Sequence, residues 1–268
     1  MTTNIESREE TGATYDFLPR LKQFAYLGNV SEKLEELSVL AESENWDYQF
    51  TTSEYNKPML YSFLIYTFDR IEEENKIAKL SDGSYSCFNT GLVTANQEPI
   101  FALFEKNRVL DRQPWYLYGF LRRGDARLSR FSMLPPMAHY FDDPSELIFD
   151  TRMELRVNYE HMIQDNKSRF PVPFNSFGDY QLQTNLRGAI ENSKERVARN
   201  YKAAVPQYHK GRIQLLLPLC LSQPGRADLA IVVERLEGFY RAATCLTLDM
   251  AYNNARLLAR PDRDWLQP

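Results

Sequence analysis

The stretch IQLLLPLCL, residues 213–221, decides the fold class of this 268-residue chain. It is the first of three apolar runs, and the others are DLAIVVE at 228–234 and YRAATCLTL at 240–248. The segments between the runs are short, so the three are predicted to be neighbouring antiparallel strands. Pro218 lies inside the first run and cannot donate a backbone hydrogen bond, which predicts an edge strand or a bulge.

A helix is predicted over residues 185–204, just before these strands. Its apolar side chains recur at steps of three and four residues from Leu186 to Ala204. Its other faces are basic, and residues 151–213 hold 11 basic and 6 acidic side chains. Such a helix either presents a basic face to a polyanion or is simply solvated.

The first half of the chain predicts helices followed by strands. Helices are expected to begin at Ser31 and at Asn56. Strands are expected at 84–94, 99–104 and 115–121, where aromatic and β-branched residues dominate. The aromatic side chains of the third strand either form a core face or stack on bases.

The middle and the end of the chain predict shorter elements. Strands are expected at 147–149 and 153–157, followed by a short helix that Asn158 caps and that runs to about residue 168. A further short helix is expected at 251–258. The pattern does not decide whether all strands join one sheet or two.

These elements predict an α+β fold with mainly antiparallel sheet or sheets, N-terminal helices and a central basic helix packed against them. Residues 1–14 are polar and aperiodic, and they are expected to be a disordered tail. Residues 15–268 are expected to form a single domain, with any sub-domain boundary near 130–150.

Composition excludes several classes of protein. The chain is 43% hydrophobic and 25% charged with a net charge of -4, which is typical of a folded soluble protein. It lacks a signal-peptide pattern and an apolar run of the roughly 18 residues that cross a bilayer, so no membrane partner is expected. Three widely spaced cysteines favour a reduced, cytoplasmic protein.

Familiar catalytic motifs are missing from the sequence. It contains no GxxxxGK[ST], GxGxxG, HExxH or GxSxG pattern. No cysteine pair has zinc spacing and the three histidines are far apart, so no metal site is predicted and no cofactor is assigned. Catalytic residues can converge from distant positions, so whether the chain is an enzyme stays open.

A polar cluster after the last apolar strand is the first candidate site. It holds a carboxylate, a phenol, two amides and a guanidinium, from Asp249, Tyr252, Asn253, Asn254 and Arg256. These groups could orient a phosphate or a base. They could equally cap a junction between a strand and a helix.

The triplet Asn89, Thr90 and Gly91 is the second candidate, because asparagine and glycine inside a strand predict a bulge or a close approach of the backbone. A ligand could be what approaches. The alternative is a bulge that only bends the sheet.

The predicted helix after Asn158 carries a third set of polar residues. His161 and Asp165 lie four residues apart and share a face, either as a general acid–base pair or as a surface pair. Asn166 and Arg169 lie on an adjacent face and are candidate ligand contacts.

A fourth set follows the basic helix. Lys202, Gln207 and Gln214 flank the end of the basic helix. Lys202 could contact a phosphate, and Gln214 opens the first apolar strand. The amide of Gln214 needs a partner there. The alternative is a solvated helix with a polar exit loop.

Five sequence blocks together resemble the bacterial and fungal family called domain of unknown function 3825, over roughly residues 20–266. They are FAYLGN at 24–29, FNTGLVT at 88–94, NYKAAVPQY at 200–208, IQLLLPLCL at 213–221 and LTLDMAYNNARLLARPDRDWL at 246–266. Members of this family accompany OST-HTH (LOTUS) and cold-shock domains, which are RNA-binding modules. The resemblance therefore implies RNA or a nucleotide as the partner.

Two functions from different classes follow. The first is binding of single-stranded RNA or a nucleotide-containing ligand, in RNA metabolism or in stress or defence. The alternative is a hydrolase of phosphodiester or pyrophosphate bonds, with Asp249 or His161 as the acid–base group and Arg256 and Lys202 on the phosphate. A second alternative is a structural or protein-interaction scaffold. The sequence assigns no oligomeric state.

Overall fold

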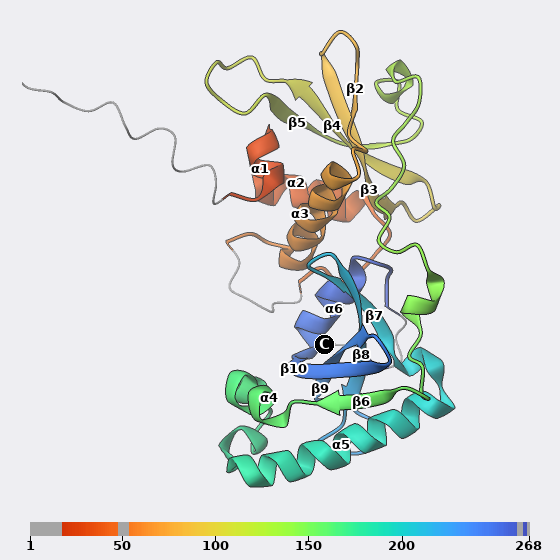
Figure 1. Cartoon of the computed structure of the whole chain (residues 1–268). Coiled ribbons are helices and arrows are strands. Elements are labelled where there is room, and N and C mark those ends of the chain that lie inside the picture. Colours follow the sequence, from red (N-terminus) through yellow and green to blue (C-terminus); the bar gives the residue numbers. More distant parts are fainter. Residues whose placement is uncertain (1–17, 48–53, 262–264, 267–268) are drawn as a thin grey trace, which may run out of the picture. The chain divides into compact units, whose positions relative to one another are not determined.

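The computed structural model describes residues 18–47, 54–261 and 265–266 (Figure 1). The expected tail at 1–14 lies outside the described residues. Contacts between Cα atoms divide the chain into two compact units, with the boundary between Ala138 and His139. Of the described residues, the first unit holds 18–46 and 54–138, and the second holds 47, 139–261 and 265–266. Each unit contains its own five-stranded sheet.

The sheet of the first unit has the order β1-β5-β4-β3-β2. Its long strands β3, β4 and β5 are antiparallel neighbours and confirm the three strands expected from the sequence. The short β1 adds to the edge in parallel with β5. The strands are β1 (Ala25–Tyr26), β2 (Ala78–Lys79), β3 (Tyr85–Val93), β4 (Pro99–Lys106) and β5 (Trp115–Arg122).

Three helices of the first unit pack against this sheet: α1 (Arg20–Phe24), α2 (Val30–Leu40) and α3 (Pro58–Glu73) (Figure 1). The N-cap of α2 is Asn29, whose Oδ1 accepts from the backbone N–H of Glu32, and not the expected Ser31. Asparagine and serine cap equally well, so the sequence leaves such a shift open. Helix α3 starts at Pro58, two residues after the expected Asn56.

A separate apolar cluster lies under the segment 123–138, which includes the 3-10 turn η1 (Leu128–Arg130). Its buried members come from β3, β4 and this segment: Cys87, Phe101, Leu103, Leu128 and Phe131. Tyr85, Tyr118 and Leu134 are partly buried against it. The segment thus covers part of the sheet without forming a long helix or a strand, and it brings its polar side chains close to the strand ends.

The sheet of the second unit has the order β6-β10-β9-β8-β7. The three apolar runs become antiparallel neighbours as expected, and β6 adds in parallel to β10. The strands are β6 (Glu154–Val157), β7 (Val205–His209), β8 (Arg212–Leu219), β9 (Leu229–Leu236) and β10 (Phe239–Leu246). The described residues therefore form two sheets, and the second sheet includes β7, which the sequence pattern did not predict.

Pro218 does not lie on an edge strand, because β8 has β9 on one side and β7 on the other. The pairing of β7 with β8 ends at Val205 and Leu216. Pro218 lies beyond that point and pairs only with Ala230 of β9. Pro218, which has no backbone N–H to donate, therefore lies where β8 has a neighbour on one side only. The same lack of a donor is the reason why an edge strand was expected.

The helices of the second unit are α4 (Tyr159–Asn166), α5 (Asp179–Arg199) and α6 (Leu248–Arg256). Short 3-10 turns are η2 (Pro144–Leu147), η3 (Lys167–Arg169), η4 (Phe174–Ser176) and η5 (Tyr201–Ala203). The Asn158 cap of α4 is confirmed, since its side chain accepts from the His161 N–H. The expected strand at 147–149 is absent, and Leu147 ends η2 instead.

Helix α5 differs from the expected 185–204 at both ends. It starts at Asp179, directly after Gly178, and at its end Asn200 caps η5 by accepting from the Lys202 N–H. Leu182, Leu186 and Ile190 of α5 are buried in one core with Leu215 and other side chains of the sheet. Helices α5 and α6 lie against opposite faces of this sheet, α5 on β8 and α6 on β7 (Figure 1).

No helix in the described part of the chain is long and apolar enough to cross a membrane.

Candidate functional site

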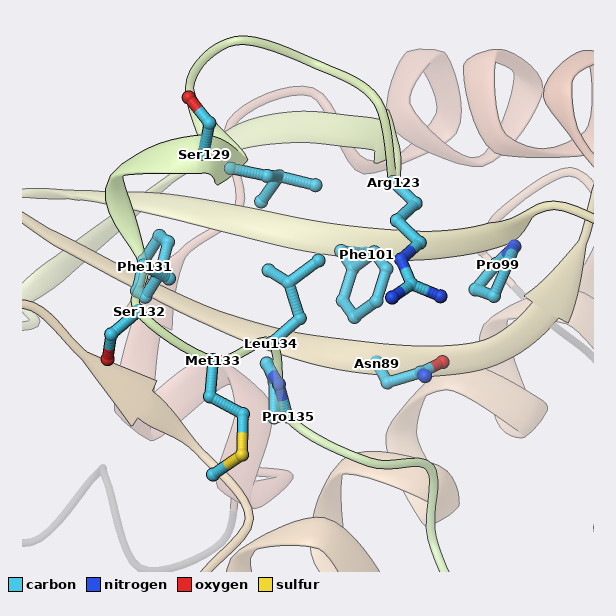
Figure 2. A pocket seen from close by; sticks show the side chains of 11 residues that line it. Asn89, Pro99, Phe101, Arg123, Ser129, Phe131, Ser132, Met133, Leu134 and Pro135 are labelled. Carbon is cyan, nitrogen blue, oxygen red and sulfur yellow. The ribbon is translucent and has the colours of Figure 1, made fainter.

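The first unit contains a pocket of about 450 Å³ where β3, β4 and the end of β5 meet the segment 123–138. Figure 2 shows the Arg123 side chain reaching from the end of β5 toward Phe101 and Asn89. The pocket is lined by Asn89, Pro99, Phe101, Arg123, Leu128, Ser129, Phe131, Ser132, Met133, Leu134 and Pro135. It joins apolar walls to a few hydroxyl groups, one amide and one guanidinium.

Asn89 lies in the pocket because β3 bulges after it. The pairing with β4 shifts between Asn89 and Val93, and Gly91 adopts a φ of 75°, a conformation that favours glycine. The Gly91 N–H donates to Asn89 Oδ1 at 3.0 Å, which fixes the amide so that its Nδ2 group remains a free donor within the described residues. The bulge expected at 89–91 is therefore present.

The Thr90 side chain forms hydrogen bonds within the same bulge. Its buried Oγ1 donates to the carbonyl of Ile100 at 2.8 Å and accepts from the Leu92 N–H at 3.2 Å. Both capacities of the hydroxyl are used inside the sheet. Of the predicted triplet, Asn89 alone lines the pocket.

Arg123 supplies the positive charge of the pocket. Its side chain is exposed and forms no hydrogen bond or ion pair with any residue that the structure describes. Guanidinium groups bind phosphates and carboxylates through two parallel hydrogen bonds. An anionic group that entered the pocket would therefore meet an arginine that need not break an existing contact.

Two further arginines lie over tyrosine rings beside the pocket. The guanidinium of Arg127 lies 4.7 Å from the ring centre of Tyr118, and that of Arg130 lies 4.7 Å from the ring centre of Tyr85. Arg130 also contacts Asp82 at 3.4 Å. Residues 122–130 thus contain four arginines, Arg122, Arg123, Arg127 and Arg130, and a single aspartate, Asp125.

The sequence itself indicates this basic segment, although none of its residues is among the predicted site residues. The run RRGDARLSR at 122–130 directly follows the aromatic strand β5. Its charge was visible, but the 81–150 region as a whole is slightly acidic. Only the fold shows that the run crosses back over the sheet and meets Asn89.

In the second unit, three of the predicted residues form one hydrogen-bonded chain. Gln207 is buried, and its Nε2 donates to Gln214 Oε1 at 2.8 Å, because the two residues are register partners in β7 and β8. Asn254 of α6 donates from Nδ2 to Gln207 Oε1 at 3.2 Å. The buried amide therefore has a partner on each side.

The remaining residues of the polar cluster lie on α6. Thr247 caps this helix by accepting from the Met250 N–H, so neither Asp249 nor the asparagines provide the cap. Partial burial raises the pKa of Asp249. Asn253 is only 4% exposed, and its Oδ1 has no hydrogen-bond partner among the described residues. Tyr252 is buried and Arg256 is half-buried.

Both units carry the match to a known family. The model of the family described as domain of unknown function, DUF3825, matches residues 37–265. The chain belongs to the DUF3825 family. No curated protein and no solved structure gives a significant match.

In this DUF3825 chain, Asn166 and Arg169 serve the fold. Arg169 Nη1 donates to the Cys245 carbonyl at 2.6 Å and to Asn166 Oδ1, and Thr244 Oγ1 donates to the same Asn166 oxygen at 3.0 Å. Asn166 also donates from Nδ2 to the Met162 carbonyl at 3.0 Å. These bonds attach the end of α4 to β10 and occupy both side chains.

His161 and Asp165 form a surface pair on α4. His161 Nδ1 lies 3.0 Å from Asp165 Oδ2, and the two side chains are 52% and 56% exposed. No hydrogen bond or ion pair between described residues connects this pair with Asp249. The two proposed catalytic groups are therefore not coupled by direct contact.

The charges on α5 are largely compensated within the helix. It holds four basic and three acidic side chains. Lys194 pairs with Glu191 at 2.9 Å, and Arg199 lies 3.5 Å from Glu195. Lys202 lies beyond α5 in η5 with an exposed side chain. In the described part of the chain, no three side chains of histidine, cysteine, aspartate or glutamate gather where they could hold a metal ion.

Proposed function

We propose that this DUF3825 chain binds single-stranded RNA or another nucleotide-containing ligand in the pocket of the first unit. One observation carries the proposal: Arg123 enters a half-open pocket without a partner in the described chain, opposite the free amide donor of Asn89. Charge, amide and apolar wall are the three elements by which proteins hold a phosphate, a base edge and a base face.

The dimensions of the pocket fit this ligand class. Its volume of about 450 Å³ lies within the range of small-molecule sites. Phe101 and Met133 offer apolar contact to a planar ring, and the Asn89 Nδ2 group can donate to a ring carbonyl or nitrogen. Arg123 then meets the phosphate.

The arginines beside the pocket suit a strand longer than one nucleotide. Arg127 and Arg130 each lie over a tyrosine ring, and this contact reduces the side-chain entropy that is lost on binding. Their N–H groups can donate to successive phosphates of a single strand.

The test is the affinity of the full chain for a fluorescent single-stranded RNA across a salt series. Arg123→Gln should weaken binding about ten- to a hundred-fold, because a hydrogen bond to a charged group is worth about 1.5–3 kcal/mol. Arg20→Gln is the matched control, since Arg20 carries the same charge in the same unit but pairs with Glu72 at 3.6 Å. Equal affinity of wild type and Arg123→Gln would reject this site.

The raised pKa of Asp249 favours the hydrolase alternative. Burial raises the pKa of this carboxyl, which is the direction of shift that favours a general acid, and it has no hydrogen-bond partner among the described residues. Incubation of the same RNA with magnesium or manganese tests it. Product that is lost in Asp249→Asn would support the hydrolase, whereas binding without product supports the binding function.

The scaffold alternative has support at other residues. Thr90, Asn166 and Arg169 use their polar groups inside the fold. If RNA neither binds nor is cleaved, the polar residues of both units would have a structural role only.

A further inference from the structure

A second pocket, of about 700 Å³, lies in the second unit between α5 and the loop after β8. Asp228 holds that loop, because its carboxylate accepts from the N–H groups of Leu221 and Ser222 at 2.7 and 2.9 Å. Arg196 of α5 donates to the Gly225 carbonyl at 3.3 Å and so joins the helix to the loop. The pocket is thus a fixed feature of this unit, separate from the site proposed for RNA.

Cys220 lines this pocket and differs from the other two cysteines. Cys87 and Cys245 are fully buried, and burial raises the pKa of each thiol to about 12. Cys220 is a free thiol that is partly exposed, on the loop that faces α5. It is therefore the cysteine of the three that a reagent in solution can reach.

The other side chains in the pocket suit a small acidic ligand. Ser193 is 3% exposed, and its Oγ has no hydrogen-bond partner among the described residues although it lines the pocket. Arg199 is 73% exposed and is held only by a 3.5 Å contact to Glu195. An exposed pair of this kind exchanges easily for a ligand carboxylate.

We propose that Cys220 is a site of reversible thiolation by a small acidic thiol, with Arg199 and Ser193 receiving the ligand's carboxylate and amide groups. The co-reactant is a disulfide such as glutathione disulfide. The Cys220 sulfur attacks one sulfur of that disulfide, a new S–S bond forms, and the other half leaves as a thiolate that takes up the proton lost by Cys220. A free thiol reverses the reaction by the same exchange.

The experiment follows mixed-disulfide formation on the reduced full chain by intact-protein mass spectrometry. Two reagents are compared at low salt: glutathione disulfide, which is acidic, and bis(2-hydroxyethyl) disulfide, which is neutral. One adduct should form with glutathione disulfide, dithiothreitol should remove it, and peptide mapping of the wild-type adduct should locate it at Cys220. Peptide mapping needs no variant, so the assignment does not depend on the folding of Cys220→Ser.

Arg199→Gln tests the recognition. It should slow the reaction with glutathione disulfide about five-fold, in line with the value of an exposed ion pair, and leave the rate with the neutral disulfide unchanged. Lys194→Gln is the matched control on the same helix, because Lys194 does not line the pocket, and it should change neither rate. Adducts at Cys87 or Cys245, no adduct at all, or equal rates for wild type and Arg199→Gln would overturn the proposal.

Discussion

Gln207 shows how one buried side chain can join three elements. Its amide connects β8 to α6 through Gln214 and Asn254. A buried amide that loses a partner keeps the cost of its desolvation. Its two partners, Gln214 and Asn254, are only half-buried.

We expect Gln207→Ala to lower the free energy of unfolding by about 2 kcal/mol, because it removes two hydrogen bonds and leaves a gap in the buried layer. Gln214→Ala leaves the buried Gln207 Nε2 without its acceptor while the desolvation cost of that amide remains, so it should also destabilise the chain, by about 1–3 kcal/mol. Urea unfolding followed by tryptophan fluorescence measures both. A Gln214→Ala variant as stable as wild type would contradict the cost assigned to the unpaired Gln207 amide.

Asp69 on α3 offers a test of pH dependence in the first unit. Burial raises its pKa to about 6, with a small opposing effect of Arg20 and small additions from Glu72 and Glu73. Its Oδ1 is buried without a hydrogen-bond partner among the described residues. Burial thus favours the neutral carboxyl more in the folded chain than in the unfolded chain.

The folded pKa of Asp69 lies above the unfolded one, so its contribution to stability is present below about pH 4 and is lost as the pH rises through about 6. We expect Asp69→Asn to abolish this loss. Because the group is half-exposed, the gain of Asp69→Asn over wild type between pH 4 and 7 should be about 1 kcal/mol. Urea midpoints of wild type and Asp69→Asn across that pH range measure it.

At the scale of single elements, two glycines differ in whether their position can accept a side chain. Gly91 has a φ of 75° in the bulge of β3, where an L-residue is strained. Gly188 lies inside α5, and an added Cβ there would meet nothing within 4 Å. The same substitution therefore has opposite consequences in the two elements.

We expect Gly91→Ala to destabilise the chain by about 1–2 kcal/mol and Gly188→Ala to stabilise it by up to about 1 kcal/mol. Thermal or urea unfolding of the two variants provides the comparison. If Gly91→Ala were neutral, the bulge would not need a left-handed residue, and the position of Asn89 in the pocket would rest on another cause.

The ends of α5 show what local patterns miss. The apolar repeat from Leu186 to Val197 predicted the helix correctly. Its true start at Asp179 adds an acidic residue, and its true end at Arg199 removes Lys202. Both changes make the helix less basic than the expected one. The helix ends at Arg199 because residues 200–204 lead into β7, which completes the sheet.

On the scale of the whole molecule, net charge cannot drive RNA binding, since the chain carries -4 overall. Any electrostatic affinity must come from a local excess of positive charge. The segment 122–130 has such an excess, whereas the charges of α5 are nearly balanced.

Salt dependence can distinguish the two regions. The double variant Arg127→Gln and Arg130→Gln should lower the slope of log K against log salt by about 0.7 for each phosphate that the variant no longer neutralises. The pair Arg199→Gln and Lys202→Gln should leave the slope unchanged. The opposite result would place the RNA on the second unit and support the basic-helix interpretation.

The sequence by itself determined the types of the elements, the α+β class and the bulge at 89–91, because periodicity, caps and glycine positions are local properties. It also indicated that the amide of Gln214 needs a partner, and it singled out Gln207 and Asn254 as candidate ligand contacts. Most long strands and helices were found within a few residues of their true ends.

Only the tertiary structure decided that the strands form two sheets, that Arg169 is used by β10, and that Arg123 meets Asn89. These facts depend on contacts between residues far apart in the chain. Such contacts form when loops close and apolar faces are buried together, and no local pattern encodes that choice of partner.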